Sequence, residues 1–235
     1  MVSDSYPLVT IIQGSGQLFW AGGMRLSFEK ASVNREYDGY LLLNDDVELK
    51  QDFFSMILET KKHCFEKYNK GGLYSGSTED RMTGAISYGG NFLHKGLENP
   101  NYTLLYPTNI PQSCHLLNAN VLFIENEVID KIGFFDTKFT HGIADYDFSL
   151  RALKSGFPVY LTPNTLGFCE DNHGDNWSKS KSLKERLKYL KSPLGLAYEE
   201  YLFYVKRHFP KYLPLIIIKL WFRTLFPGFF GFIKR

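Results

Sequence analysis

The sequence predicts an α/β fold in which a mostly parallel sheet is flanked by helices. Short apolar runs alternate with helix-like segments along the chain, the order expected where helices connect the strands of a parallel sheet. The apolar run Tyr40–Leu43 carries no charged residue on either face, which is typical of a strand buried on both sides. A basic, aromatic segment at the C-terminal end predicts a helical appendage to this domain.

Each predicted element depends on a local pattern. Strands are predicted where apolar residues run together, at Leu8–Ile12, Gly39–Leu43, Leu73–Ser77, Asn120–Ile124 and Pro158–Leu161. Helices are predicted where apolar residues recur at helical spacing, after Gly23, Gln51, Asn126 and Asp145. Residues 82–113 carry Gly, Asn, Pro and Tyr in short pieces and predict a loop-rich or antiparallel insert of the kind that shapes a binding site.

Three polar residues, Asn44, Asp45 and Asp46, directly follow the strand predicted at Gly39–Leu43. In open α/β sheets the ligand crevice lies at the carboxyl ends of the strands. Magnesium and manganese are typically held by one or two carboxylates together with substrate phosphates, so Asp46, with Asp45 behind it, predicts a divalent-cation site. The same residues also fit a simple turn before the helix near Asp52.

A second acidic cluster lies at the start of another predicted helix. Asp145 is expected near the N-cap of this helix and Gly156 at its C-cap. The positive end of a helix favours an ionised carboxylate, which suits a general base. Asp147 precedes Arg151 by four residues, so a structural ion pair on one helix face is the prediction for that acid.

Five sequence blocks occur in a fixed order within residues 7–175. They are residues 13–25, 42–46, 117–120, 132–136 and 144–151. In this order they resemble the inverting family-2 glycosyltransferases of the GT-A fold, and five ordered blocks are far more specific than any one of them. The resemblance implies a GT-A-like sheet and transfer of a sugar from a nucleotide-sugar to an acceptor hydroxyl.

The resemblance also implies roles for particular residues. Asn44, Asp45 and Asp46 would bind the donor diphosphate and its divalent cation, Mn or Mg. Asp145 would be the catalytic base, although Ala144 stands where the family usually has Glu. The family's usual N-terminal strand, helix and strand are expected to be missing ahead of the segment that resembles its later part.

Further candidates come from single residues. Gly22 and Gly23 would let the backbone approach a phosphate at a helix start, or form an ordinary turn. Arg25 would neutralise a diphosphate, or be a solvated helix residue. His173 is either a second metal ligand, as in some relatives, or a surface residue; its imidazole suits manganese better than magnesium.

The charge distribution divides the chain into two regions. Residues 1–178 carry 14 Lys and Arg against 22 Asp and Glu, whereas residues 179–235 carry 13 against 3. An acidic domain of this kind is a poor nucleic-acid binder, so we expect no nucleic-acid partner. We assign residues 1–178 to the glycosyltransferase-like domain and residues 179–235 to a basic, aromatic helical tail.

The tail contains an apolar helix-like run, Leu215–Phe226, with Lys219 and Arg223 on one face. This pattern predicts a helix at a membrane surface, with apolar side chains in the acyl boundary and the cations at anionic headgroups. The run is shorter than the roughly 20 residues that span a bilayer. The alternative is a helix that packs on the domain or on a second subunit.

The predicted function is inverting glycosyl transfer, of the hexosyl or deoxyhexosyl class, in cell-surface polysaccharide or glycan synthesis. The expected partners are a UDP- or dTDP-sugar donor, a glycan or lipid-linked acceptor, and a membrane surface. The odd number of cysteines and the lack of a visible signal peptide predict a cytoplasmic protein at the inner face of the membrane. Two alternatives remain: a non-catalytic, membrane-associated binding remnant of the same fold, and a nucleotidyltransferase.

Overall fold

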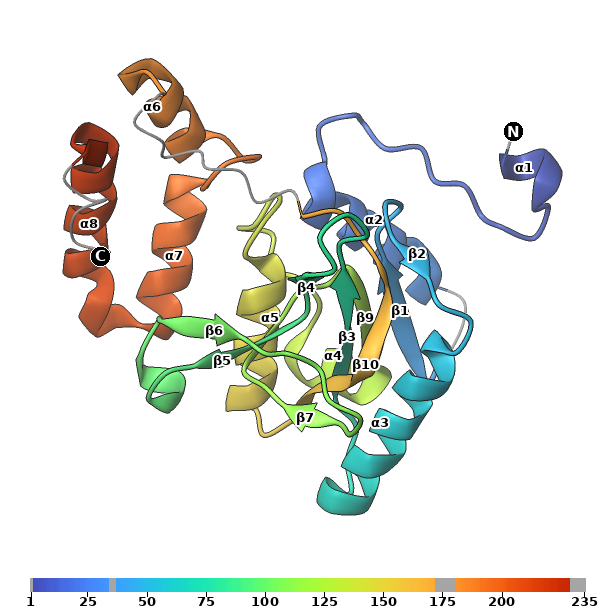
Figure 1. The fold of residues 1–235 in the computed structure, drawn as a ribbon. Coiled ribbons are helices and arrows are strands. Elements are labelled where there is room, and N and C mark those ends of the chain that lie inside the picture. Colours follow the sequence, from blue (N-terminus) through green and yellow to red (C-terminus); the bar gives the residue numbers. More distant parts are fainter. Residues whose placement is uncertain (1, 34–36, 172–180, 229–235) are drawn as a thin grey trace.

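A computed structural model describes residues 2–33, 37–171 and 181–228 of the chain. Within them, the protein has an α/β fold with a central sheet flanked by helices (Figure 1). The sheet has the strand order β1-β9-β3-β10-β2. These strands are β1 (Gly39–Leu43), β9 (Val121–Glu125), β3 (Leu73–Glu79), β10 (Val159–Phe168) and β2 (Glu48–Leu49).

The sheet is mixed, so the prediction of a mostly parallel sheet is wrong. Among the strand pairs of the described residues, β3 and β10 run parallel, whereas β1–β9, β9–β3 and β10–β2 are antiparallel. The helix and strand patterns in the sequence indicate which residues are buried, but they do not indicate which strands pair or in which direction. Here β9, far along the chain, lies antiparallel between β1 and β3.

The prediction of a strand at Leu8–Ile12 is also wrong. This segment forms no strand, and Leu8 is 99% exposed. Figure 1 shows the chain before α2 (Phe19–Ser32), including the short α1 (Val2–Ser5), extending away from the sheet. An apolar run becomes a strand only where a neighbouring strand pairs with its backbone, and none of the strands in the described part of the chain pairs with this segment.

Helices cover both faces of the sheet. Because successive side chains of a strand point to opposite faces, the sheet has a hydrophobic core on each face. On one face α3 (Phe53–Tyr68) packs through Ile57 and Cys64 against Tyr74, Val121 and Phe123. The opposite face carries the larger core. It is covered by α2, α4 (Asn126–Ile132) and α5 (Ala144–Lys154). These helices confirm the four helical patterns predicted for this part of the chain.

Residues 82–113 form the predicted antiparallel insert. It contains β4 (Ile86–Tyr88), β5 (Gly90–Leu93), η1 (Gly96–Glu98), β6 (Tyr102–Leu104) and β7 (Gln112–Ser113). β5 pairs antiparallel with β6 and with β8 (Leu116–Leu117), which makes a second, small sheet. This small sheet lies beside α5 and leads the chain into β9.

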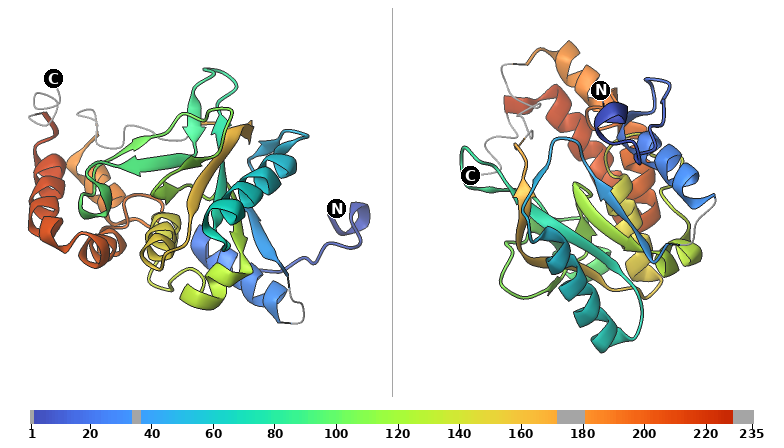
Figure 2. Two further views of the ribbon diagram at one scale, coloured as in Figure 1. Left: turned by 90° about the horizontal axis from the view of Figure 1, so that it is seen from below. Right: turned by 90° about the vertical axis from the view of Figure 1, so that its right-hand side faces the viewer.

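The C-terminal region is helical, as predicted. Its elements are α6 (Leu183–Lys191), α7 (Tyr198–His208), η2 (Pro210–Tyr212) and α8 (Leu213–Leu225). Figure 2 shows these orange and red helices grouped at one end of the molecule. They are not independent of the sheet domain, because Tyr204, Val205, Phe209 and Ile216 belong to the same buried core as α5.

Two further findings concern the described residues. None of the helices found there has both the length and the apolar character needed to cross a bilayer. The three cysteines, Cys64, Cys114 and Cys169, are all buried free thiols. Burial raises the pKa of Cys169 to about 11, so this thiol stays protonated at neutral pH.

Candidate active site

The first part of the site lies at the carboxyl end of β1. Asn44 accepts a 2.8 Å hydrogen bond from Trp20 Nε1 on its side chain, and its backbone N–H donates to the Asn120 carbonyl at 3.0 Å. These bonds tie the end of β1 to α2 and to the loop before β9. Asn44 and Asp46 line a cavity, whereas Asp45 is exposed and does not line it.

The cavity has a volume of about 570 Å³ and joins elements from distant parts of the chain. Asp145, at the start of α5, lines the same cavity as Asp46. The two acids that the sequence identified separately are therefore brought together. The other lining residues are Trp20, Asn44, Tyr88, Asn118, Ala119, Asn120, His141, Gly142, Tyr189, Leu194 and Gly195.

Asp145 is the second residue of α5, close to the predicted N-cap position. Its carboxylate accepts hydrogen bonds from the backbone N–H groups of Tyr146 at 2.8 Å and of Ala119 at 3.3 Å. Burial nevertheless outweighs these bonds and raises the pKa of Asp145 to about 6. The N-terminus of α5 therefore does not keep the pKa of Asp145 in its ordinary range, although the position of this residue in the sequence suggested that it would.

The loop between β8 and β9 connects the two acids. The Ala119 N–H donates to Asp145, and the carbonyl of the next residue, Asn120, accepts from Asn44. Asn118 also donates from its side chain to Asp145, which opposes the effect of burial on the pKa of that acid. This loop therefore fixes the end of β1 and the start of α5 relative to each other.

Asp147 forms the ion pair predicted for it. Its carboxylate accepts from Arg151 Nε at 2.8 Å, on the same face of α5. Asp147 is fully buried and does not line the cavity. The prediction of a structural role for this acid is confirmed.

Three of the predicted donor-binding residues lie away from the cavity. Gly22 is buried against Leu18, and Gly23 lines a different depression together with the segment before α2. Arg25 donates hydrogen bonds to the carbonyls of Asp136 and Phe139, at 3.1 and 2.8 Å. In this arrangement Arg25 holds the loop before α5, and it does not line the cavity that the two acids share.

The metal prediction depends on two residues, of which the structure describes one. Asp46 lies at the cavity, whereas His173 lies outside the described residues. Among the residues with described positions, no three His, Cys, Asp or Glu side chains gather in a way that could hold a metal ion. Asp46 instead has Cys169 as a side-chain neighbour, and this contact contributes to the raised pKa of that thiol.

Several cavity residues were not predicted to act there. His141 lines the cavity and accepts a 3.4 Å hydrogen bond from the Trp20 N–H, and burial lowers the pKa of its imidazole. Tyr189, Leu194 and Gly195 come from α6 and the α6–α7 loop. Their only sequence signal is a Gly in a turn. Gly195 approaches the Tyr189 carbonyl so closely that a β-carbon would collide with it.

Comparison with known proteins adds no identification. No protein-family model matches the chain, and no curated protein matches it. The function is therefore inferred from the geometry of this site together with the ordered sequence blocks.

Proposed function

We propose that this protein is a glycosyltransferase that moves a sugar from a nucleoside diphosphate sugar, a UDP- or dTDP-sugar, to an acceptor hydroxyl with inversion. The observation that carries the proposal is the cavity shared by Asp145 and Asp46. Asp145, a desolvated carboxylate at one wall, would serve as the base that this reaction requires. Asp46, an exposed carboxylate at the end of β1, lies where the donor diphosphate would bind. The ordered sequence blocks that resemble family-2 glycosyltransferases support the same reaction.

In the proposed reaction Asp145 removes the proton from the acceptor hydroxyl while its oxygen attacks the anomeric carbon. The bond from that carbon to the diphosphate oxygen breaks on the opposite side, so nucleoside diphosphate leaves and the configuration inverts. A pKa of about 6 leaves Asp145 deprotonated at neutral pH and makes it a stronger base than an ordinary aspartate. The Ala119 and Asn120 backbone holds both sides of the cavity in place.

The oxygen donors at the end of β1 fit a divalent cation such as Mn or Mg. Asp46 offers a carboxylate and Asn44 a carbonyl oxygen, and such ions commonly take few protein ligands when substrate phosphates supply the others. When bound, the cation would offset negative charge on the diphosphate. Asp45 does not line the cavity and is the less suitable ligand.

We further propose that the protein works at the inner face of the cell membrane, bound through α8. The outer side of this helix presents four apolar residues that are 38 to 65% exposed: Leu215, Ile218, Phe222 and Leu225. Trp221, which lies within the run Leu215–Phe226 predicted to meet the membrane surface, instead donates a 2.9 Å hydrogen bond to Tyr198 on α7. The proposed contact therefore consists of aliphatic residues and Phe222.

The decisive test is release of nucleoside diphosphate by the purified chain, measured with a panel of UDP- and dTDP-sugars, with Mn or Mg, with and without acceptor glycosides. We expect Asp145→Asn to abolish release and Glu66→Gln, on the exposed side of α3, to preserve it. The kcat/KM should rise with pH through about 6, as Asp145 loses its proton.

The result separates this function from the alternatives. Release of pyrophosphate would indicate nucleotidyl transfer, and donor binding without any turnover would indicate a binding protein. Full activity of Asp145→Asn would eliminate Asp145 as the base.

A further inference from the structure

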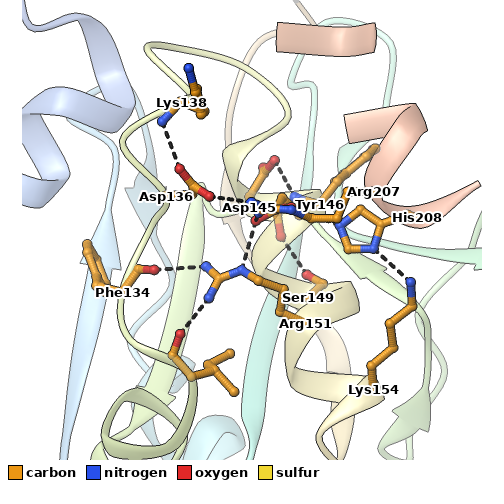
Figure 3. A network of polar contacts seen from close by, with 12 residues as sticks. Phe134, Asp136, Lys138, Asp145, Tyr146, Ser149, Arg151, Lys154, Arg207 and His208 are labelled. Atoms are coloured by element: carbon orange, nitrogen blue, oxygen red, sulfur yellow. Dashed lines mark hydrogen bonds and ion pairs between the residues drawn. The ribbon is translucent and has the colours of Figure 1, made fainter. Parts of the chain in front are cut away.

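The first turn of α5 is held by a buried network that reaches the C-terminal region (Figure 3). At its centre the fully buried carboxylate of Asp147 accepts hydrogen bonds from three residues. Arg151 Nε lies at 2.8 Å, Arg207 Nη1 at 2.9 Å from one oxygen and 3.1 Å from the other, and His208 Nε2 at 2.8 Å. Although burial acts to raise the pKa of Asp147, the bond from His208 and the charges of Arg151 and Arg207 hold it below its ordinary value.

The network joins three parts of the chain. Arg151 belongs to α5 and also donates to the carbonyls of Ile132 and Phe134, at 2.7 and 2.8 Å. Arg207 belongs to α7 and forms a second ion pair with Asp136, at 2.5 Å. The start of α5, the chain before it and the end of α7 are therefore fixed to one another.

His208 takes part as a neutral imidazole. Its Nδ1 lies 3.0 Å from Lys154 Nζ, which can only donate, so Nδ1 accepts and Nε2–H donates to Asp147. Burial lowers the pKa of His208, which agrees with this tautomer at neutral pH. The groups that face the imidazole come from both helices: Asp147 and Lys154 on α5, and the neighbouring Arg207 on α7.

The turn that this network holds is strained. Ile143, directly before α5, has φ of 67°, a region that a β-branched residue rarely adopts. Its carbonyl accepts the 2.9 Å bond from the Asp147 N–H, so the strained residue begins the turn that contains Asp145. Such a conformation is unfavourable and persists only where surrounding contacts impose it.

We infer that Arg207 and His208 are positioning residues for the proposed base: by holding Asp147 from α7, they keep the strained first turn of α5 in the conformation that presents Asp145 to the cavity. The C-terminal region is then part of the catalytic unit. The inference rests on the proposed function for the role of Asp145, but the position and environment of this carboxyl can be measured without turnover.

The primary experiment is a carboxyl ¹³C NMR titration of Asp145 in the full chain, assigned with Asp145→Asn. We expect a pKa of about 6 in the wild type. In Arg207→Gln the loosened turn admits water, so the pKa should fall by about one pH unit towards its ordinary value. Lys206→Gln, an exposed neighbour on α7, is the matched control and should titrate as the wild type.

Two further variants separate positioning from general stability. His208→Gln keeps a donor for Asp147 and should retain the wild-type pKa of Asp145, whereas His208→Phe should lower it. Gly at position 143 adopts a positive φ without strain, so Ile143→Gly should restore the pKa in the Arg207→Gln background. If Arg207→Gln folds and Asp145 titrates as in the wild type, the inference is refuted. If Arg207→Gln does not fold, the same unchanged titration in His208→Phe refutes it.

An activity measurement then tests the consequence. Nucleoside diphosphate release should show at least a tenfold lower kcat in Arg207→Gln with little change in the KM for the donor. An inactive wild type would overturn the proposed function and leave the titration to decide the positioning. If the wild type is active and a folded Arg207→Gln variant has the same kcat, the positioning role is refuted and the proposed function stands.

Discussion

Replacing the proposed base should make the protein more stable at neutral pH, and the gain should depend on pH. The pKa of Asp145 is about 6 in the folded protein and 3.8 ordinarily. A pKa difference of one is worth about 1.4 kcal/mol, so burying this carboxylate costs about 3 kcal/mol of the free energy of unfolding where it is ionised. Asn cannot ionise, so Asp145→Asn avoids this cost.

The sign follows from which state loses its proton first. Well below pH 3.8 Asp145 is protonated in both states and contributes no pH dependence. As the pH rises towards 6 the unfolded chain releases the proton while the folded protein keeps it, so wild-type stability falls. Above 6 the full cost is present. Asp145→Asn should therefore gain about 3 kcal/mol relative to the wild type between pH 3.5 and pH 8.

Urea unfolding of both proteins at several pH values measures this gain directly. A constant offset of about 1 kcal/mol against the variant is expected at every pH, because Asn replaces a carboxylate oxygen that accepts from Ala119 or Tyr146. Glu66→Gln should follow the wild type, since Glu66 is exposed. Equal dependence on pH in Asp145→Asn and the wild type would show that Asp145 is not desolvated, and the argument for a tuned base would fail.

Three other outcomes follow from the structure. Asp46→Asn should weaken Mn-dependent binding of nucleoside diphosphate at least tenfold by calorimetry while Asp45→Asn should not; equal effects would mean that the cavity does not distinguish the two acids. Arg25→Met should lower the free energy of unfolding by about 1–3 kcal/mol, because two carbonyls lose a charged hydrogen-bond donor, whereas the affinity for the nucleotide-sugar should change little. A loss of that affinity without a loss of stability would indicate instead that Arg25 binds the diphosphate. Ile218→Asp and Phe222→Asp should reduce sedimentation of the full chain with anionic vesicles. Unaltered sedimentation would show that α8 does not contact the membrane.

Much of the fold could be predicted because burial leaves a local signature in the sequence. β1 has the predicted bounds, Gly39–Leu43, and β3 begins at the predicted residue, Leu73. The direction of pairing could not be predicted, since β9 lies between these strands through contacts that no local pattern records. The apolar segment Leu8–Ile12 shows the same limit, because composition alone does not supply a pairing partner.

The site was predictable to the extent that its residues follow regular elements. Asp46 follows a strand and Asp145 begins a helix, and the fold brings both to one cavity. Tyr189 and Gly195 could not be placed there, because they lie in the C-terminal region that the charge pattern separates from the rest of the chain. Arg25 matched a diphosphate ligand by type, yet two backbone carbonyls take its donors.

The pKa of Asp145 shows why position in a helix is insufficient to predict the chemistry of an acid. A helix N-terminus stabilises a carboxylate by roughly 0.3–1 kcal/mol at exposed sites, whereas the burial of Asp145 costs about 3 kcal/mol even after its hydrogen bonds. Burial therefore decides the sign of the shift. Asp147, two residues later in the same helix, is buried more completely and yet stays ionised, because three donors converge on it. One turn of α5 thus holds an acid with a raised pKa, Asp145, and an acid with a lowered pKa, Asp147, and the donors on α5 and α7 that converge on Asp147 account for the difference.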